Sequence, residues 1–142
     1  MPAGFVIDTL AESEIPQAVA LWQACNLTRP WNDPHADARF ALGGPGSTIL
    51  AGRQGGVLIG AIMVGHDGHR GAVYYVGVLP DHRKLGIGAA LMAAAEQWLQ
   101  DRGVPKLNVM VRTGNLGARG FYECLGYEPS EVVVLSKRLG GC

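Results

Sequence analysis

The sequence contains, over residues 76–91, the stretch Val76-Gly77-Val78-Leu79-Pro80-Asp81-His82-Arg83-Lys84-Leu85-Gly86-Ile87-Gly88-Ala89-Ala90-Leu91. The β-branched residues before Pro80 indicate a strand, and the residues after Gly86 show helical spacing. A helix therefore begins at two glycines directly after a strand and a turn. The first N–H groups of a helix have no partner within it, and a residue without Cβ lets a ligand approach them. With Arg83 and Lys84 beside it, this turn predicts a site for a pyrophosphate.

The structural alternative for this stretch is a turn that glycine makes flexible, with two basic residues exposed to solvent. Three features weigh against it: a strand precedes the glycines, Pro80 forces the turn, and the helix that follows is amphipathic. The spacing fits neither GxxxxGK[ST] nor a complete GxGxxG, because residue 91 is leucine. A nucleotide-phosphate-binding protein that uses the same helix end stays an alternative.

The rest of the chain alternates between strand and helix patterns. We expect strands over 4–10, 47–53, 57–65, 71–79, 106–111 and 131–139, and helices over 15–22, 35–42, 86–101 and 116–125. Tight turns join the three strands between 47 and 79 and indicate antiparallel pairing. The prediction is an α/β (α+β) fold, with a mixed, mostly antiparallel sheet and helices on both faces.

Length and composition limit the classes of protein. A chain of 142 residues suits a single domain over 1–142, and 48% hydrophobic residues exclude disorder. Twelve basic residues balance twelve acidic ones, so we expect no nucleic-acid partner. The longest uncharged stretch, 71–80, is too short to cross a bilayer. The first residues lack a basic leader, so we expect no membrane association and a cytoplasmic protein.

Cysteine and histidine usage predicts no metal site. The three cysteines, Cys25, Cys124 and Cys142, show no CxxC spacing, so neither a disulfide framework nor a zinc site is expected. We expect Cys25 and Cys124 to be small buried residues in helices. His66, Asp67 and His69 lack a fourth ligand and suit a solvated hairpin.

Two motifs resemble the GNAT N-acetyltransferases over nearly the whole chain. The signature [RQ]-x-x-G-x-[GA] stands at Arg83, Gly86 and Gly88, after the V-x-P of residues 78–80. The second motif, N-x-x-A-x-x-F-Y-x-x-x-G-[FY], runs from Asn115 to Tyr127. A small bacterial branch of YpeA type is similar at Leu21-Trp22, Cys25, residues 29–34, 67–71 and 137–139, and Tyr74-Tyr75.

The resemblance implies an acetyl-CoA-dependent N-acetyltransferase with a GNAT fold. Acetyl-CoA would lie where the strand that ends at Leu79 and the strand that begins at Lys106 splay apart. The Val78 N–H would donate to the thioester oxygen as it becomes an oxyanion. The cofactor-binding residues implied are Val78, Leu79, Arg83, Lys84, Leu85, Gly86, Ile87, Gly88, Ala89 and Asn115, the last of which also suits a helix N-cap.

Catalysis, by the same resemblance, falls to Tyr122 and Val78. A phenol can give a proton to the departing thiolate without being ionised at neutral pH. Relatives often carry a glutamate on the strand before V-x-P to deprotonate the amine, whereas residues 72–79 hold no carboxylate. The base is left open among Asp33, Asp67, His69 and a water held by Tyr75, and the amine can also arrive neutral.

The acceptor is expected to be a small-molecule or peptide amine, on the opposite side of the sheet from the pyrophosphate. Arg29, Trp31, Asp33 and Tyr75 are the substrate-binding residues predicted, with Arg29 and Asp33 able to hold a carboxylate and an ammonium. A catalytically weak acyl-CoA-binding module is the alternative function; it would not need Tyr122. The apolar run 132–135 can pair as a strand edge with a second subunit, as in a homodimer.

Overall fold

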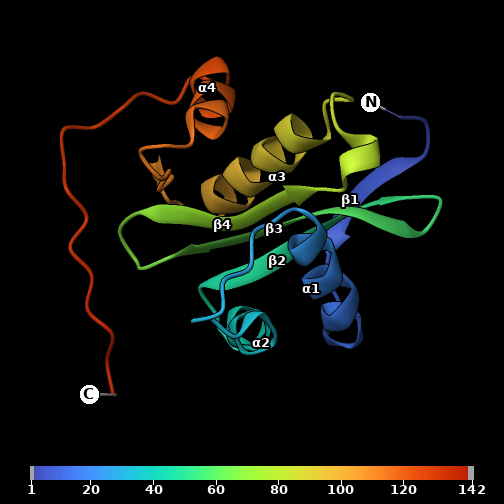
Figure 1. Cartoon of the computed structure of the whole chain (residues 1–142), viewed down its shortest axis with the longest axis horizontal. Coiled ribbons are helices and arrows are strands. Elements are labelled where there is room, and N and C mark those ends of the chain that lie inside the picture. Colours follow the sequence, from blue (N-terminus) through green and yellow to red (C-terminus); the bar gives the residue numbers. More distant parts are fainter. Residues whose placement is uncertain (1, 141–142) are drawn as a thin grey trace. The chain divides into compact units, whose positions relative to one another are not determined.

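The computed structural model describes residues 2–140 (Figure 1). Its elements are β1 (Phe5–Thr9), the 3₁₀ helix η1 (Glu12–Glu14), α1 (Ile15–Ala24), α2 (Pro34–Gly43), β2 (Ser47–Gln54), β3 (Val57–His66), β4 (Gly71–Val78), the 3₁₀ helix η2 (Pro80–His82), α3 (Ile87–Asp101), β5 (Leu107–Asn108) and α4 (Leu116–Cys124). They fall into two compact units, one up to Val109 and one from Met110 onward. That the whole chain is one domain stays a prediction.

The five strands form one sheet in the order β1-β2-β3-β4-β5. Strands β1 to β4 pair antiparallel and β5 lies parallel to β4, which confirms the mixed, mostly antiparallel sheet. The β4–β5 pairing consists of Gly71 with Leu107 and Ala72 with Asn108. The two strands therefore separate after two residue pairs, and the predicted splay is confirmed.

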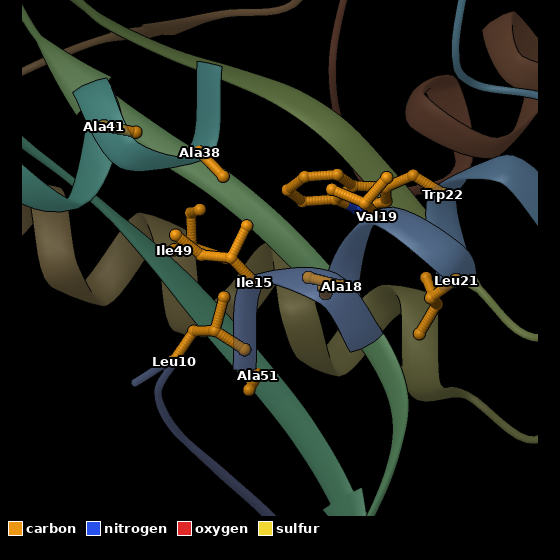
Figure 2. Packing of buried hydrophobic residues seen from close by; sticks show 11 residues of the cluster. Leu10, Ile15, Ala18, Val19, Leu21, Trp22, Ala38, Ala41, Ile49 and Ala51 are labelled. Atoms are coloured by element: carbon orange, nitrogen blue, oxygen red, sulfur yellow. The ribbon is translucent and has the colours of Figure 1, made fainter. Parts of the chain in front are cut away.

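Helices cover both faces of the sheet in the first unit. Helix α3 packs on β2, β3 and β4 from one side, whereas α1 and α2 pack on the other side (Figure 1). Helix α1 begins at Ile15 with Pro16 in its first turn, where a missing N–H breaks no bond. Its apolar residues at intervals of three and four, which include Ala18 and Trp22, are buried against the sheet (Figure 2). Each large side chain buried in this way contributes about 1.5–3 kcal/mol to folding.

Two of the predicted strands differ in the structure. The strand expected over 106–111 is reduced to Leu107–Asn108. Residues 131–139 form neither helix nor strand, and Val133 and Leu135 are 83% and 91% exposed. Strand propensity expresses how side chains pack on a pleated surface, and it supplies no ladder partner. The described part of the second unit contains α4 and no strand, so the prediction of a last strand is wrong.

The cysteines follow the prediction only in part. Cys25 is half-buried at the C-cap of α1, whereas Cys124 is exposed on α4. Cys142 lies outside the described residues. Burial of Cys124 is therefore a wrong prediction.

Within the described residues, no helix has the length and apolar character that crossing a bilayer requires.

Arg53 of β2 joins the first strand to the turn that leads into α1. Its Nε donates to Asp8 Oδ1 at 2.9 Å, and its terminal nitrogens donate to both Glu14 oxygens. The Arg53 bonds to Glu14, with a further one from the Ala11 N–H, lower the pKa of Glu14 from its ordinary 4.5 to about 2. Because the folded-state pKa is depressed, the stabilisation is complete above about pH 4.5 and is lost as the pH falls toward 2.

We expect Arg53→Met to lower the free energy of unfolding by about 1–2 kcal/mol at pH 7, less than the full pKa shift implies because the pair is partly exposed. At pH 3 the difference in the free energy of unfolding between the variant and the parent should be less than half of its value at pH 7. Urea denaturation at the two pH values checks this. Arg119→Met, which breaks an exposed pair with Glu123, is the control and should change stability by less than about 0.5 kcal/mol. An equal deficit for Arg53→Met at both pH values would contradict the ion-pair account.

Candidate functional site

A β-bulge interrupts β4 in its middle. Ala61 pairs with Gly77 and Met63 pairs with Tyr74, so Ile62 faces two residues of β4, Tyr75 and Val76. Tyr75 has φ +53°, in the left-handed region that side chains other than glycine rarely adopt. Bulges and strained backbone both concentrate next to functional sites, because they re-aim side chains and end regular pairing.

Beyond the bulge, no strand among the described residues pairs with the outer edge of β4. The Leu79 N–H donates to Ile59 O at 2.9 Å, so Leu79 faces β3. Because antiparallel hydrogen bonds alternate along a strand, the Val78 N–H and C=O point away from β3. The Val78 oxygen accepts from Arg83 Nε at 3.1 Å and from the Cys25 thiol at 3.2 Å. The Val78 N–H thus lies on the edge that β5 leaves open.

The loop after β4 delivers an uncapped helix end. Lys84 and Gly86 both have positive φ, +64° and +82°, and Gly86 is the N-cap of α3. Among the described residues, no side chain caps this helix. The N–H groups of its first turn, Ile87, Gly88 and Ala89, therefore keep their hydrogen-bonding capacity and the partial positive charge of the helix end. This is the geometry of an anion site.

Some residues of this loop are exposed and accessible to a ligand, whereas others stabilise the fold. Lys84 is exposed and Leu85 is 46% exposed, whereas the Ile87 side chain is buried in the core and leaves only its backbone for a ligand. The Arg83 side chain braces the turn through its bond to Val78. Since the Leu79 N–H is used within the sheet, a ligand contact from Leu79 has to involve its carbonyl oxygen or side chain.

On the face covered by α1 and α2, Tyr75 is fixed between two helices. Its ring stacks on Trp22 of α1, with ring centres 4.4 Å apart and an interplanar angle of 25°. Its hydroxyl donates to Asp37 Oδ2 of α2 at 2.8 Å. Burial and the nearby carboxylates of Asp37 and Asp33 raise the pKa of Tyr75 to about 12. The phenol therefore stays protonated throughout the neutral range.

Comparison with known proteins identifies the family. The family model "Acetyltransferase (GNAT) family" matches residues 12–127 of the chain. The chain belongs to this family. An acetyltransferase of Yersinia enterocolitica is 42% identical to this GNAT protein over 133 residues, 94% of either chain.

Solved structures share the GNAT fold with this protein. The aminoglycoside acetyltransferase AAC(6')-Iy, in complex with the bisubstrate analog CoA-S-monomethyl-acetylneamine, has a TM-score of 0.81 at 19% identity, covering 94% of this chain and 97% of that one. A ribosomal-protein-alanine N-acetyltransferase from Brucella melitensis biovar Abortus has a TM-score of 0.76 at 21% identity, covering 95% and 99%. These likenesses confirm the fold expected from the sequence.

Of the acceptor residues predicted for this GNAT protein, two have a role in the local backbone. A terminal nitrogen of Arg29 donates to the oxygens of Asn26 and Thr28, each at 2.8 Å. Asp33 is the N-cap of α2, and its Oδ1 accepts from two backbone N–H groups at 3.1 Å. Trp31 is 57% exposed and is no part of the core. Tyr75 is in contact with both covering helices.

The proposed bases on the hairpin lie at the wrong end of β4. Asp67 closes the β3–β4 turn by accepting from the His69 and Arg70 N–H groups at 2.9 and 2.8 Å, which lowers its pKa. Strand β4 runs from this turn to Val78 and is about 23 Å long at its ordinary rise per residue. Asp67 and His69 are thus not brought to the Val78 end. Asp37, which the sequence analysis missed, is in contact with β4 instead.

The second unit carries the rest of the predicted residues on α4. Asn115 is the N-cap of this helix, as its sequence context predicts, and its side chain accepts from the Ala118 N–H at 3.0 Å. The Tyr122 ring makes edge contacts with Phe121 and Tyr127 at centre distances of 5.1 and 5.9 Å. Burial raises the pKa of the Tyr122 phenol above its ordinary 10. It is neutral at pH 7 and still carries its proton.

Among the described residues, no group of three His, Cys, Asp or Glu side chains is arranged to hold a metal ion.

Proposed function

We propose that this GNAT protein transfers the acetyl group from acetyl-CoA to a primary amine by direct attack within a ternary complex. The observation that carries the proposal is the pair of amide donor sets at the end of β4. Val78 presents its N–H on the open edge of the strand, and the next element, α3, presents an uncapped first turn. A thioester joined to a pyrophosphate by an extended arm suits this arrangement, because it needs a strand-like edge and an anion site in sequence.

The cofactor supplies an activated acetyl group when it is bound. The N–H groups of Ile87, Gly88 and Ala89 hold the pyrophosphate, and Lys84 adds positive charge beside them. Arg83 acts by keeping the Val78 carbonyl and the loop in place. The Val78 N–H donates to the carbonyl oxygen as negative charge develops there, so this contact strengthens during the reaction.

Proton transfer completes the proposed reaction. Tyr122 gives its phenolic proton to the departing thiolate, a role that its raised pKa suits because the proton is present at neutral pH. Asn115 holds the start of α4 through its cap bond, and we propose it as an additional cofactor contact. Arg29, Trp31 and Asp33 belong to the segment between α1 and α2, and we propose that this segment forms the acceptor side.

A screen of amine classes tests the proposed function. The purified protein is given acetyl-CoA with an alkyl diamine, an amino acid, an aminoglycoside and a peptide with a free N-terminus, and thiol release is corrected for hydrolysis. The aminoglycoside and the peptide are included because two solved structures of the same fold are named an aminoglycoside acetyltransferase and a ribosomal-protein-alanine N-acetyltransferase. We expect release above the blank with at least one class. Tight CoA binding without any release would favour the acyl-CoA-binding module instead.

A further inference from the structure

Asp37 is a carboxylate whose partner is an uncharged group. It lies in α2, is half-buried, and accepts from the Tyr75 hydroxyl through Oδ2. Among the described residues, neither Asp37 nor Asp33 is paired with a cation, and no hydrogen bond is found to Asp37 Oδ1. A half-buried carboxylate with one neutral donor keeps acceptor capacity and a negative charge that no side-chain cation offsets, which favours a cationic ligand.

The segment from the end of α1 to α2 is tied to β4 at both ends. At its start the Cys25 thiol donates to Val78 O, and Leu27 lies 3.1 Å from the point that a Cβ on Gly77 would occupy. At its end Asp37 accepts from Tyr75. The segment therefore follows the half of β4 that β5 leaves unpaired. Tyr75 and Val78 are three residues apart, about 10 Å along a strand.

The Tyr75–Asp37 pair is held rigidly in this place. The Tyr75 backbone is fixed at the bulge with φ +53°, and its ring stacks on Trp22, which is fully buried. The sequence of β4, Gly71 to Val78, contains no acidic residue of its own. Helix α2 thus brings a carboxylate to the open half of a strand that lacks one.

We propose that Asp37, fixed by the Tyr75 hydroxyl, takes the proton from the acceptor ammonium during acetyl transfer. This inference rests on the proposed function and adds the base to it. The ammonium N–H proton moves to Asp37, the nitrogen lone pair forms the bond to the acetyl carbon, and the carbon–sulfur bond breaks. As the amide forms, the nitrogen loses a second proton, which replaces the one that Tyr122 gives to the departing thiolate, and Asp37 releases its proton to solvent. One amide, one thiol and one proton result from one ammonium and one thioester.

The charged surroundings of Asp37 are compatible with this role. From β4 it is faced by Tyr75, and from the N-cap of α2 by Asp33. Helix α2 itself carries His35 and Arg39, while α1 carries no charged residue. Of the two other strands packed on α2, β2 contributes Arg53, which is bonded to Asp8 and Glu14, and β3 contributes His66 at its last position.

The decisive comparison is Asp37→Asn against the parent with the best amine of the screen. Asparagine keeps an oxygen for the Tyr75 hydroxyl but cannot take a proton. We expect kcat/KM for the amine to fall by at least about tenfold at pH 7, with KM for acetyl-CoA unchanged. The difference in kcat/KM between the parent and Asp37→Asn should narrow as the pH rises toward the pKa of an alkyl amine, about 10, since the acceptor then arrives neutral. Glu12→Gln, which removes an exposed acidic charge from η1, is the matched control and should keep the parent profile.

Binding provides a second readout that does not depend on turnover. Titration calorimetry of 1,4-diaminobutane into the CoA-loaded protein should show weaker binding, by about tenfold, for Asp37→Asn. Tyr75→Phe keeps the stacked ring and should fall between parent and Asp37→Asn in both assays. A parent that turns over an amine while Asp37→Asn matches it at every pH would overturn the inference and leave the proposed function intact. A parent that turns over no amine would refute the proposed function, and unchanged diamine binding by Asp37→Asn would then overturn the inference as well.

Discussion

Gly88→Val is expected to weaken CoA binding by more than about 100-fold while the fold stays intact. Gly88 is the second residue of α3, where its N–H is one of the unpaired donors and the absence of Cβ keeps the approach open. A branched side chain here blocks at least two charge-assisted hydrogen bonds, each of about 1.5 kcal/mol or more, and their loss corresponds to roughly 100-fold in affinity. Calorimetric titration with CoA measures the change.

The control for Gly88→Val is Ala93→Val, an equal side chain at an exposed position of the same helix. Because valine is tolerated in a helix at least as well as glycine, Gly88→Val should keep the parent's circular dichroism and melting temperature, and Ala93→Val should lose at most about 0.7 kcal/mol of stability. Gly86→Val is a poor test, since φ of +82° strains any other side chain there whatever the space. Parent-like affinity in a folded Gly88→Val protein would place the pyrophosphate elsewhere.

The helices and central strands could be predicted because local signals agree with tertiary structure. In α1 the spacing of Ile15, Val19 and Trp22 defines one buried face, and all three side chains are buried. In α3 the helical spacing of Leu91, Ala94 and Trp98 suggests one buried face, but Ala94 and Trp98 are only partly buried, whereas Met92, Ala95 and Leu99 are buried. Helix α3 approaches the sheet closely where a strand residue has no Cβ. For example, a Cβ at Gly71 would lie 2.5 Å from the Leu99 side chain.

The absence of a strand over 131–139 could not be predicted, because strand formation depends on a partner strand as well as on local composition. Val132-Val133-Val134-Leu135 has the composition of a strand, and all four residues are exposed. Propensity of this kind is realised only when another strand supplies hydrogen bonds. The same reasoning explains β5, whose two paired residues are those that meet Gly71 and Ala72 before the strands diverge.

In the candidate site, too, features set by neighbouring residues could be predicted, whereas contacts between distant segments could not. The glycine loop and the Asn115 cap depend on residues within a few positions and were predicted from the sequence. Asp37 was not predicted, because its contact with Tyr75 spans 38 residues and depends on how α2 packs on β4. Its only sequence signal is the interval of four from Asp33, which places both carboxylates on one side of the helix.

Tyr122→Phe is expected to lower kcat by about 100-fold or more and to leave CoA affinity nearly unchanged. The proposed role of the hydroxyl begins only as the thiolate leaves, so its removal affects the transition state and not the ground state. Phenylalanine keeps the edge contacts with Phe121 and Tyr127. The N-cap of α4 is Asn115, so the substitution also leaves the helix cap unchanged. Steady-state kinetics with an acceptor from the screen and calorimetry with CoA separate the two quantities.

Tyr127→Phe is the matched control for this prediction, since it removes a hydroxyl from the ring in edge contact with Tyr122 and should keep kcat within about twofold. Because burial raises the pKa of Tyr122, the parent should keep its acid through pH 9, and the ratio of parent to Tyr122→Phe should stay constant between pH 6 and 9. An unchanged kcat in Tyr122→Phe would show that water protonates the thiolate. A joint fall of kcat and CoA affinity would show that the hydroxyl anchors the cofactor, because the loss of a contact made only in the transition state would leave CoA affinity unchanged.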